Sequence, residues 1–187
     1  MKRRLYALAL VTLVGFPALG WTVLGFFEDE PLQIIFRSEY SLLMQVILGL
    51  PIGVVAGLMA KWIISRPRWQ KVGIKYARII SRFGLSTTGI WFISFCAGVG
   101  EELLFRGALQ PLMGIWLTAF VFVAIHGYLD PRNRELFIYG IFMTITIAGL
   151  GYLVEYIGIW TAAIAHMMID VILFYHLTGL NTDNSHQ

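Results

Sequence analysis

Residues 85–110, LSTTGIWFISFCAGVGEELLFRGALQ, form a stretch long and apolar enough to cross a membrane, although it contains three charged side chains. A transmembrane helix needs about 20 mostly apolar residues. Charged groups inside such a helix are rare because each costs at least about 2.5 kcal/mol to insert. Glu101, Glu102 and Arg106 therefore need partners or a function, and the stretch predicts a membrane protein with an internal polar site.

The rest of the chain has the same apolar character. Hydrophobic residues make up 58% of its 187 residues and charged residues 13%, against about a quarter charged in soluble domains. Further stretches of spanning length occupy residues 5–27, 41–64, 112–128, 136–156 and 159–177. We expect one all-α integral membrane domain over residues 1–187, a polytopic bundle of about six transmembrane helices. The first is expected to be a retained anchor, because no small-residue cleavage site follows it.

The basic residues lie mainly between the predicted spans. Seven Lys and Arg residues fall in 61–82, three in 2–4, and two at positions 132 and 134. Because short loops rich in Lys and Arg stay cytoplasmic, we expect both termini on the cytoplasmic side of a bacterial cytoplasmic membrane. The basic residues are then expected to interact with the lipid bilayer. A nucleic-acid role is disfavoured despite the net charge of +3. The polar tail at 181–187 is predicted to be disordered.

Residues 67–83 are predicted to form a cytoplasmic amphipathic segment. Basic residues at 71, 75, 78 and 82 recur at helical spacing, and apolar residues fall largely on the opposite side. We expect this helix to lie flat on the membrane surface. A solvated basic loop is the alternative interpretation.

Three glycines in the second predicted span, Gly49, Gly53 and Gly57, recur at every fourth residue. Such a face lets another helix approach closely. Packing within the chain is sufficient to explain it, so no homo-oligomer is predicted.

The ionisable residues within the predicted spans form the candidate site: Glu101, Glu102, Arg106, His126, His166 and Asp170. If the third and fourth spans are antiparallel, Glu101 and His126 lie roughly 18 Å below their connecting turn, at 1.5 Å per residue. The same count from Gly158 gives roughly 12 and 18 Å for His166 and Asp170. These groups are therefore expected at one level, in the middle or inner half of the bilayer.

Adjacent helical residues point about 100° apart, so the two glutamates should have different roles. Glu102 and Arg106 are four residues apart with the acid first, the favourable order for a helical ion pair. Glu101 is then left facing the cavity, where it can act as a general base toward water. His126 and His166 are expected to share a water proton or to donate toward a developing oxyanion.

A metal site is the main chemical alternative. Glu101, His126, His166 and Asp170 match zinc or iron ligands in type. No HExxH motif occurs, so no local ligand spacing demands a metal, and the favoured mechanism requires no cofactor. Ion transport is disfavoured because the sequence has no evident inverted repeat.

Three short motifs in the polar spans resemble those of one known family. Residues 101–107, EELLFRG, match EExxxR; residues 122–126, FVAIH, match FxxxH; and residues 166–170, HMMID, match HxxxN/D. The family is that of the CAAX proteases and bacteriocin-processing enzymes, also called the CPBP or Abi intramembrane proteases, which includes the type II CAAX prenyl endopeptidases. The resemblance covers a catalytic core over residues 83–177.

This resemblance implies an intramembrane endopeptidase in which Glu101 and His126 activate water while His166 and Asp170 support the oxyanion. Asp170 stands where the prenyl endopeptidases have Asn. An ionised Asp cannot donate a hydrogen bond, so here it must be protonated or must orient His166 instead. Relatives of the family have also been named metalloproteases, which leaves zinc open.

The function expected from the sequence is hydrolysis of a peptide bond in a membrane-associated protein or peptide, with a CAAX-like target as one option. The alternative is a non-catalytic membrane immunity or binding protein on the same scaffold.

Overall fold

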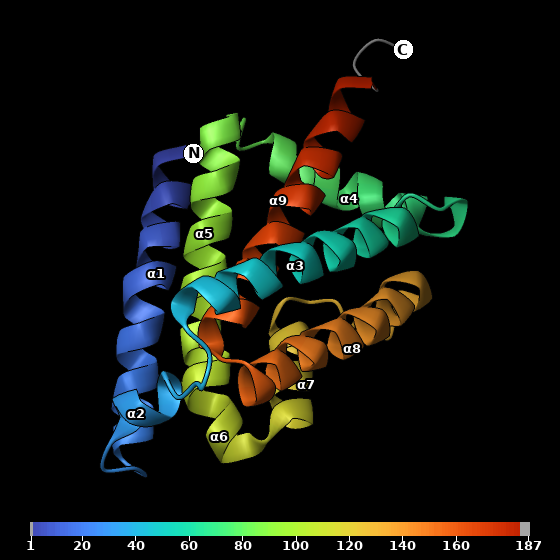
Figure 1. The fold of residues 1–187 in the computed structure, drawn as a ribbon. Coiled ribbons are helices and arrows are strands. Elements are labelled where there is room, and N and C mark those ends of the chain that lie inside the picture. Colours follow the sequence, from blue (N-terminus) through green and yellow to red (C-terminus); the bar gives the residue numbers. More distant parts are fainter. Residues whose placement is uncertain (1, 184–187) are drawn as a thin grey trace.

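A computed structural model describes residues 2–183 of the chain, and every regular element within them is a helix (Figure 1). The elements follow in the order α1 (Lys2–Gly25), α2 (Pro31–Ile35), α3 (Leu42–Ile64), η1 (Pro67–Trp69), α4 (Gln70–Ser81), α5 (Thr87–Leu104), η2 (Phe105–Leu109), α6 (Gln110–Met113), α7 (Ile115–Ile125), α8 (Arg134–Tyr156) and α9 (Ile159–Asp183). The predicted all-α membrane bundle is confirmed.

Five helical stretches are long and apolar enough to cross a membrane: α1, α3, the continuous run from α5 through α6, α8 and α9. The sixth predicted span, residues 112–128, instead contains α7, which has only 11 residues. Such a helix is about 16 Å long, roughly half the hydrocarbon thickness. Gly114 and Gly127 bound it at φ 77° and 76°, a left-handed backbone that ends a helix.

Polar caps explain where three long helices begin. The side chain of Ser41 accepts a hydrogen bond from Met44 N at the start of α3, and Ser86 caps α5 in the same way. Asn133 Oδ1 accepts from Leu136 N at the start of α8. Each cap satisfies a donor that the first helical turn leaves without a partner.

Helix α9 lies at the centre of the bundle, in contact with α3, α4, α5 and α8 (Figure 1). Its approach to α3 depends on the predicted glycine face. A Cβ atom at Gly53 would stand 2.5 Å from Ala165 O, and one at Gly49 would stand 2.7 Å from Thr161 O. The glycines therefore serve packing within the chain, as predicted.

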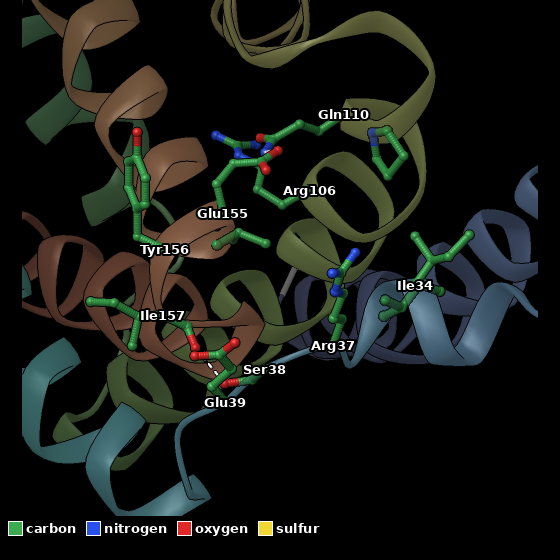
Figure 2. Close-up of a pocket in the computed structure, with 12 residues that line it drawn as sticks. Ile34, Arg37, Ser38, Glu39, Arg106, Gln110, Glu155, Tyr156 and Ile157 are labelled. Carbon is green, nitrogen blue, oxygen red and sulfur yellow. Dashed lines mark hydrogen bonds between the residues drawn. The ribbon is translucent and has the colours of Figure 1, made fainter.

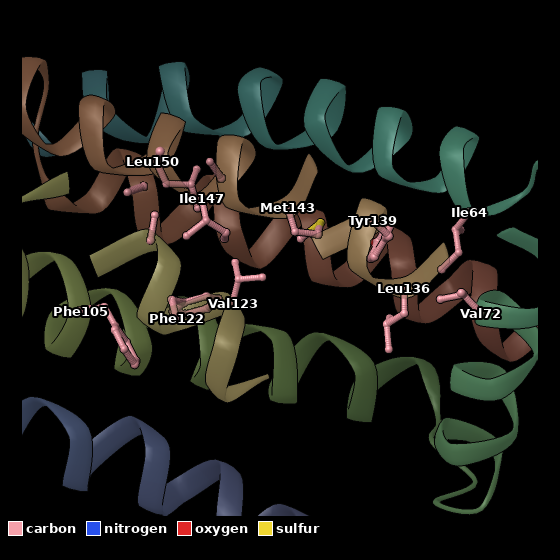
Figure 3. Close-up of a cluster of buried hydrophobic side chains, with 14 of the residues drawn as sticks. Ile64, Val72, Phe105, Phe122, Val123, Leu136, Tyr139, Met143, Ile147 and Leu150 are labelled. Atoms are coloured by element: carbon pink, nitrogen blue, oxygen red, sulfur yellow. The ribbon is translucent and has the colours of Figure 1, made fainter. Parts of the chain in front are cut away.

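The buried apolar core joins α5, η2, α7 and α8 (Figure 3). Phe105 and Phe122 meet edge to face with ring centroids 4.9 Å apart. Val123, Met143 and Ile147 continue this core. On the outside of the bundle, by contrast, large apolar side chains are exposed along α1 and α3, as expected of surfaces that face hydrocarbon.

The predicted amphipathic segment is helical, as η1 and α4. Its apolar residues Val72, Ala77 and Ile80 are buried and the helix packs against α9. Its position at a membrane surface stays a prediction. The predicted disordered tail, 181–187, is helical over its first three residues, because α9 continues to Asp183. Residues 184–187 lie outside the described residues.

Candidate active site

Glu101 and Glu102 lie near the end of α5, directly before a π-helical turn, η2, that contains Arg106. Such turns occur mostly as short insertions in α-helices, often at functional sites. Glu102 Oε2 lies 3.3 Å from Arg106 Nε, and both side chains are almost completely buried. Arg106 Nη2 also donates to Ile147 O of α8 at 3.2 Å. The two residues thus form a buried ion pair that ties α5 to α8.

Glu102 has a second partner that the sequence did not indicate. Its Oε1 lies 2.8 Å from Nδ1 of His166 on α9. Because an ionised carboxylate can only accept, Nδ1 of His166 carries the proton in this contact. The other ring nitrogen, Nε2, lies 3.8 Å from Asp170 Oδ2. Glu102 is therefore shared by Arg106 and His166, and it fixes the orientation of the His166 ring.

Glu101 faces His126 on the other side of α5. Its Oε2 lies 3.6 Å from His126 Nε2, and the two side chains are 15% and 33% exposed. His126 follows the last residue of α7, and its Nδ1 lies 2.7 Å from Phe122 O. Since a carbonyl only accepts, Nδ1 donates and Nε2 of the neutral ring keeps a free lone pair. The Phe122 ring stacks on the imidazole with centroids 4.3 Å apart.

These groups line a cavity of about 300 Å³. Glu101, His126, His166 and Asp170 form its polar part. Its apolar part comes from α1, α5, α7, α8 and α9: Leu5, Leu8, Ala9, Ile93, Ala97, Phe122, Met143, Ile147, Ile169, Leu173 and Phe174, with Thr12 of α1 beside them. The structure thus brings the six sequence-predicted residues together, and it adds α1 as a wall that sequence reasoning did not assign.

Tyr128 is a further polar residue of this cavity that sequence reasoning missed. Its ring lies parallel to that of His126, with centroids 6.3 Å apart. It also packs against Tyr76 of α4 and Tyr139 of α8. Burial raises the pKa of Tyr128 well above its ordinary value, so the phenol stays protonated and can donate a hydrogen bond. Its position two residues after His126, beyond a helix-ending glycine, was the available signal.

A second and larger cavity of about 510 Å³ lies beyond Arg106 (Figure 2). Gln110 Nε2 donates there to Gly151 O and to Glu155 Oε1, both at 3.1 Å. Arg37 and Glu39 line the cavity from the loop after α2. No histidine lines it among the described residues, so it lacks an acid–imidazole pair despite its size. The smaller cavity is therefore the candidate active site.

The candidate residues do not gather into a ready-made cluster of metal ligands within residues 2–183. Their types suit zinc, yet no group of three or more His, Cys, Asp or Glu among residues 2–183 is placed to hold an ion. Nδ1 of each histidine is engaged, by Glu102 in one case and by Phe122 O in the other. A metal ion could therefore be bound by these rings only through Nε2, the arrangement common for histidine ligands.

The comparisons with known proteins place these motifs in a family. The family described as type II CAAX prenyl endopeptidase Rce1-like matches residues 83–172, which include all six candidate residues. The uncharacterized protein YpbD of Bacillus subtilis (strain 168) is 31% identical over 86 residues, covering 44% of this chain and 42% of YpbD. The chain thus matches less than half the length of that relative. No solved structure matches significantly. Residues 83–172, which carry the three motifs, thus match the family of Rce1-like type II CAAX prenyl endopeptidases, in agreement with the resemblance that the motifs indicate.

Proposed function

We propose that the protein is an intramembrane endopeptidase that hydrolyses a peptide bond in a membrane-associated protein or peptide. The observation that carries this proposal is the placement of Glu101 Oε2 3.6 Å from His126 Nε2 in a cavity inside an apolar helical bundle. The match of residues 83–172 to a family described as endopeptidases supports it.

The proposed reaction begins with a water molecule held beside Glu101 and His126. The Glu101 carboxylate takes one proton from the water while the oxygen of that water bonds to the scissile carbonyl carbon. Nε2 of His126 accepts a hydrogen bond from the remaining O–H, because Nδ1 is occupied as a donor. The carbonyl oxygen becomes an oxyanion. When the C–N bond breaks, Glu101 returns its proton to the leaving nitrogen.

The oxyanion needs donors on the opposite side of the cavity. His166 can donate from Nε2 when its ring carries both protons, a form stabilised by the carboxylate of Glu102 at Nδ1. Asp170, 3.8 Å from that Nε2, would hold the ring in place. Glu102 and Arg106 touch no reacting atom in this scheme and act as positioning residues.

The shape of the cavity suggests which substrates enter. Leu5 and Leu8 of α1 and Leu173 and Phe174 of α9 surround the polar groups with apolar surface. This lining suits a substrate held in the membrane by an apolar segment or a lipid group, and a CAAX-like carboxyl terminus is one such class. We further propose that both termini are cytoplasmic in a bacterial cytoplasmic membrane, following the Lys and Arg bias of the loops.

The test uses the purified protein in lipid nanodiscs with three peptide classes: prenylated CAAX peptides, the same peptides without the prenyl group, and apolar transmembrane peptides. Mass spectrometry of the products identifies the cleaved bond. We expect cleavage of at least one class by the wild type, no cleavage by Glu101→Gln, and unchanged cleavage with a zinc chelator. Equal product from wild type and Glu101→Gln would refute the mechanism. Loss with chelator, restored by zinc, would show a metal enzyme.

A non-catalytic immunity or binding role is the competing outcome. It would show as protection of cells that survives Glu101→Gln and His126→Ala, with no product from any peptide class.

A further inference from the structure

A third concave site lies away from both cavities described above. It has a volume of about 370 Å³ and lies between α4 and the start of α8. Val72 and Leu136, which are almost completely buried, form its apolar floor (Figure 3). Two segments about 60 residues apart in the sequence therefore form one pocket at the end of the bundle where basic residues gather.

The rim of this pocket is strongly basic. Lys71 and Lys75 of α4 face Arg132 and Arg134, which flank the cap of α8. None of these four cations lies within ion-pair distance of a carboxylate in the described part of the chain. Glu135 is the one acidic residue of the lining, so the lining carries a formal charge of +4 − 1 = +3. Like charges held together without counter-charges favour an anion.

The pocket is held in shape by hydrogen bonds between uncharged side chains and the backbone rather than by its charged side chains. Trp69 Nε1 donates to Glu135 O at 3.2 Å and ties η1 to α8. Asn133 Oδ1 accepts from Leu136 N at 3.0 Å and caps α8. The first turn of this 23-residue helix adds partial positive charge on the same side. The cations are thus presented on a fixed frame without an ion pair to neutralise them, and Lys75 Nζ lies 5.8 Å from the centroid of the Tyr76 ring.

We propose that this pocket binds a phosphate group. Converging Lys and Arg side chains are the usual recognition for a phosphate, since several of its oxygens can accept charge-assisted hydrogen bonds at once. The pocket volume of about 370 Å³ has room for a phosphate together with a polar group attached to that phosphate. Because α4 runs beside the ends of the membrane-spanning helices, the phosphate of an anionic lipid headgroup and a free phosphate are both chemically suitable. Basic pockets at this level of membrane proteins bind such headgroups.

The experiment measures the thermal unfolding midpoint of the full-length protein in neutral detergent as four probes are titrated: phosphatidylglycerol, phosphatidylserine, phosphatidylcholine and inorganic phosphate. We expect the unfolding midpoint to rise to a plateau as phosphatidylglycerol is added and to change little with zwitterionic phosphatidylcholine. A comparable rise with inorganic phosphate would assign the site to free phosphate, and a rise confined to the anionic lipids would assign it to headgroups. Both results support phosphate binding. No rise with any probe would overturn it.

Two matched quadruple variants separate this pocket from general basic attraction. The pocket variant is K71Q/K75Q/R132Q/R134Q, and the control K61Q/R66Q/R78Q/R82Q removes four exposed cations that do not line the pocket. We expect each pocket cation lost to weaken binding by about fivefold, while the control keeps most of the wild-type affinity. Equal weakening in the two variants would show diffuse attraction and reject the site. The double variants K71Q/K75Q and R132Q/R134Q give the same comparison if the quadruple variant does not fold.

Discussion

The two cavities on either side of Arg106 differ in what they contain. The one beyond Arg106 is larger, at about 510 Å³, and there the amide of Gln110 donates to Gly151 O and to Glu155 Oε1. The smaller one, of about 300 Å³, holds a carboxylate opposite an imidazole. General acid–base chemistry needs such a pair within reach of one water molecule. The candidate active site is therefore identified by the kind and spacing of its polar groups rather than by the volume of its cavity.

The largest expected effect tests this contrast directly with one glutamate from each cavity. Glu101→Gln removes the proposed base and should lower the cleavage rate by about 10²–10⁴-fold. Glu155→Gln is the matched change in the other cavity and should leave the rate within about twofold, because it has no role in the proposed reaction. Rates are compared in nanodiscs with the peptide cleaved by the wild type. Equal losses in the two variants would erase the distinction between the cavities.

Substitutions of buried polar residues near the two cavities should also differ in how much they lower the free energy of unfolding. Glu102→Gln leaves Arg106 as a buried cation without its counter-charge, and this typically costs about 3–5 kcal/mol. Gln110→Leu removes two hydrogen bonds and leaves their acceptors, Gly151 O and Glu155 Oε1, without this donor. We expect this change to lower the free energy of unfolding by about 1–3 kcal/mol. Unfolding in mixed micelles by titration with sodium dodecyl sulfate measures both. A smaller loss for Glu102→Gln than for Gln110→Leu would mean that the ion pair contributes little to folding.

The candidate active-site cavity also depends on the close packing of α9, which carries His166 and Asp170. Gly53→Ala places a Cβ atom 2.5 Å from Ala165 O, so we expect a loss of about 1–3 kcal/mol. Gly149→Ala on α8 meets nothing within 4 Å and should be neutral or stabilising by up to about 1 kcal/mol, from helix propensity. The same unfolding titration applies. Similar stabilities for both variants would show that α3 and α9 can separate without cost.

The smallest effect is expected for Asp170→Asn. An amide keeps the size of the side chain and can still orient the His166 ring, 3.8 Å away, so the cleavage rate should fall by less than about tenfold, a change of less than 1.4 kcal/mol. Asp170→Ala serves as the comparison, because it removes the contact altogether and should cost more. A loss as large as that of Glu101→Gln would show that a carboxylate is required here.

The sequence predicted contacts best where both partners lie on one helix, because their spacing along the chain then determines their distance. Spacing alone indicated the Glu102–Arg106 pair, because residues four apart share a helical face. It did not indicate the bond between Glu102 and His166, since that contact requires α5 and α9 to approach closely. They do so at Gly98, where a Cβ atom would stand 2.7 Å from Ala163 O. Distances between helices depend on such packing, which a single sequence does not reveal.

Hydropathy likewise located the apolar segments but misjudged one of them. Residues 112–128 have the composition of a full span, whereas the structure ends α7 at Ile125. The signal against a full span was Gly127, which has positive φ. The role of α1 as a cavity wall was also missed, because its residues Leu5 and Leu8 carry no chemical signature of a site. Basic segments that lie far apart in the chain gave no sign that they share one pocket.

The short α7 has a consequence for the surrounding lipid. A helix of about 16 Å cannot match a hydrocarbon layer of about 30 Å, so acyl chains beside it must shorten or tilt. We therefore expect the bilayer to be thinnest beside α7, which ends one residue before His126. The proposed active site would then receive its water through this thinned part of the membrane rather than through a channel in the protein.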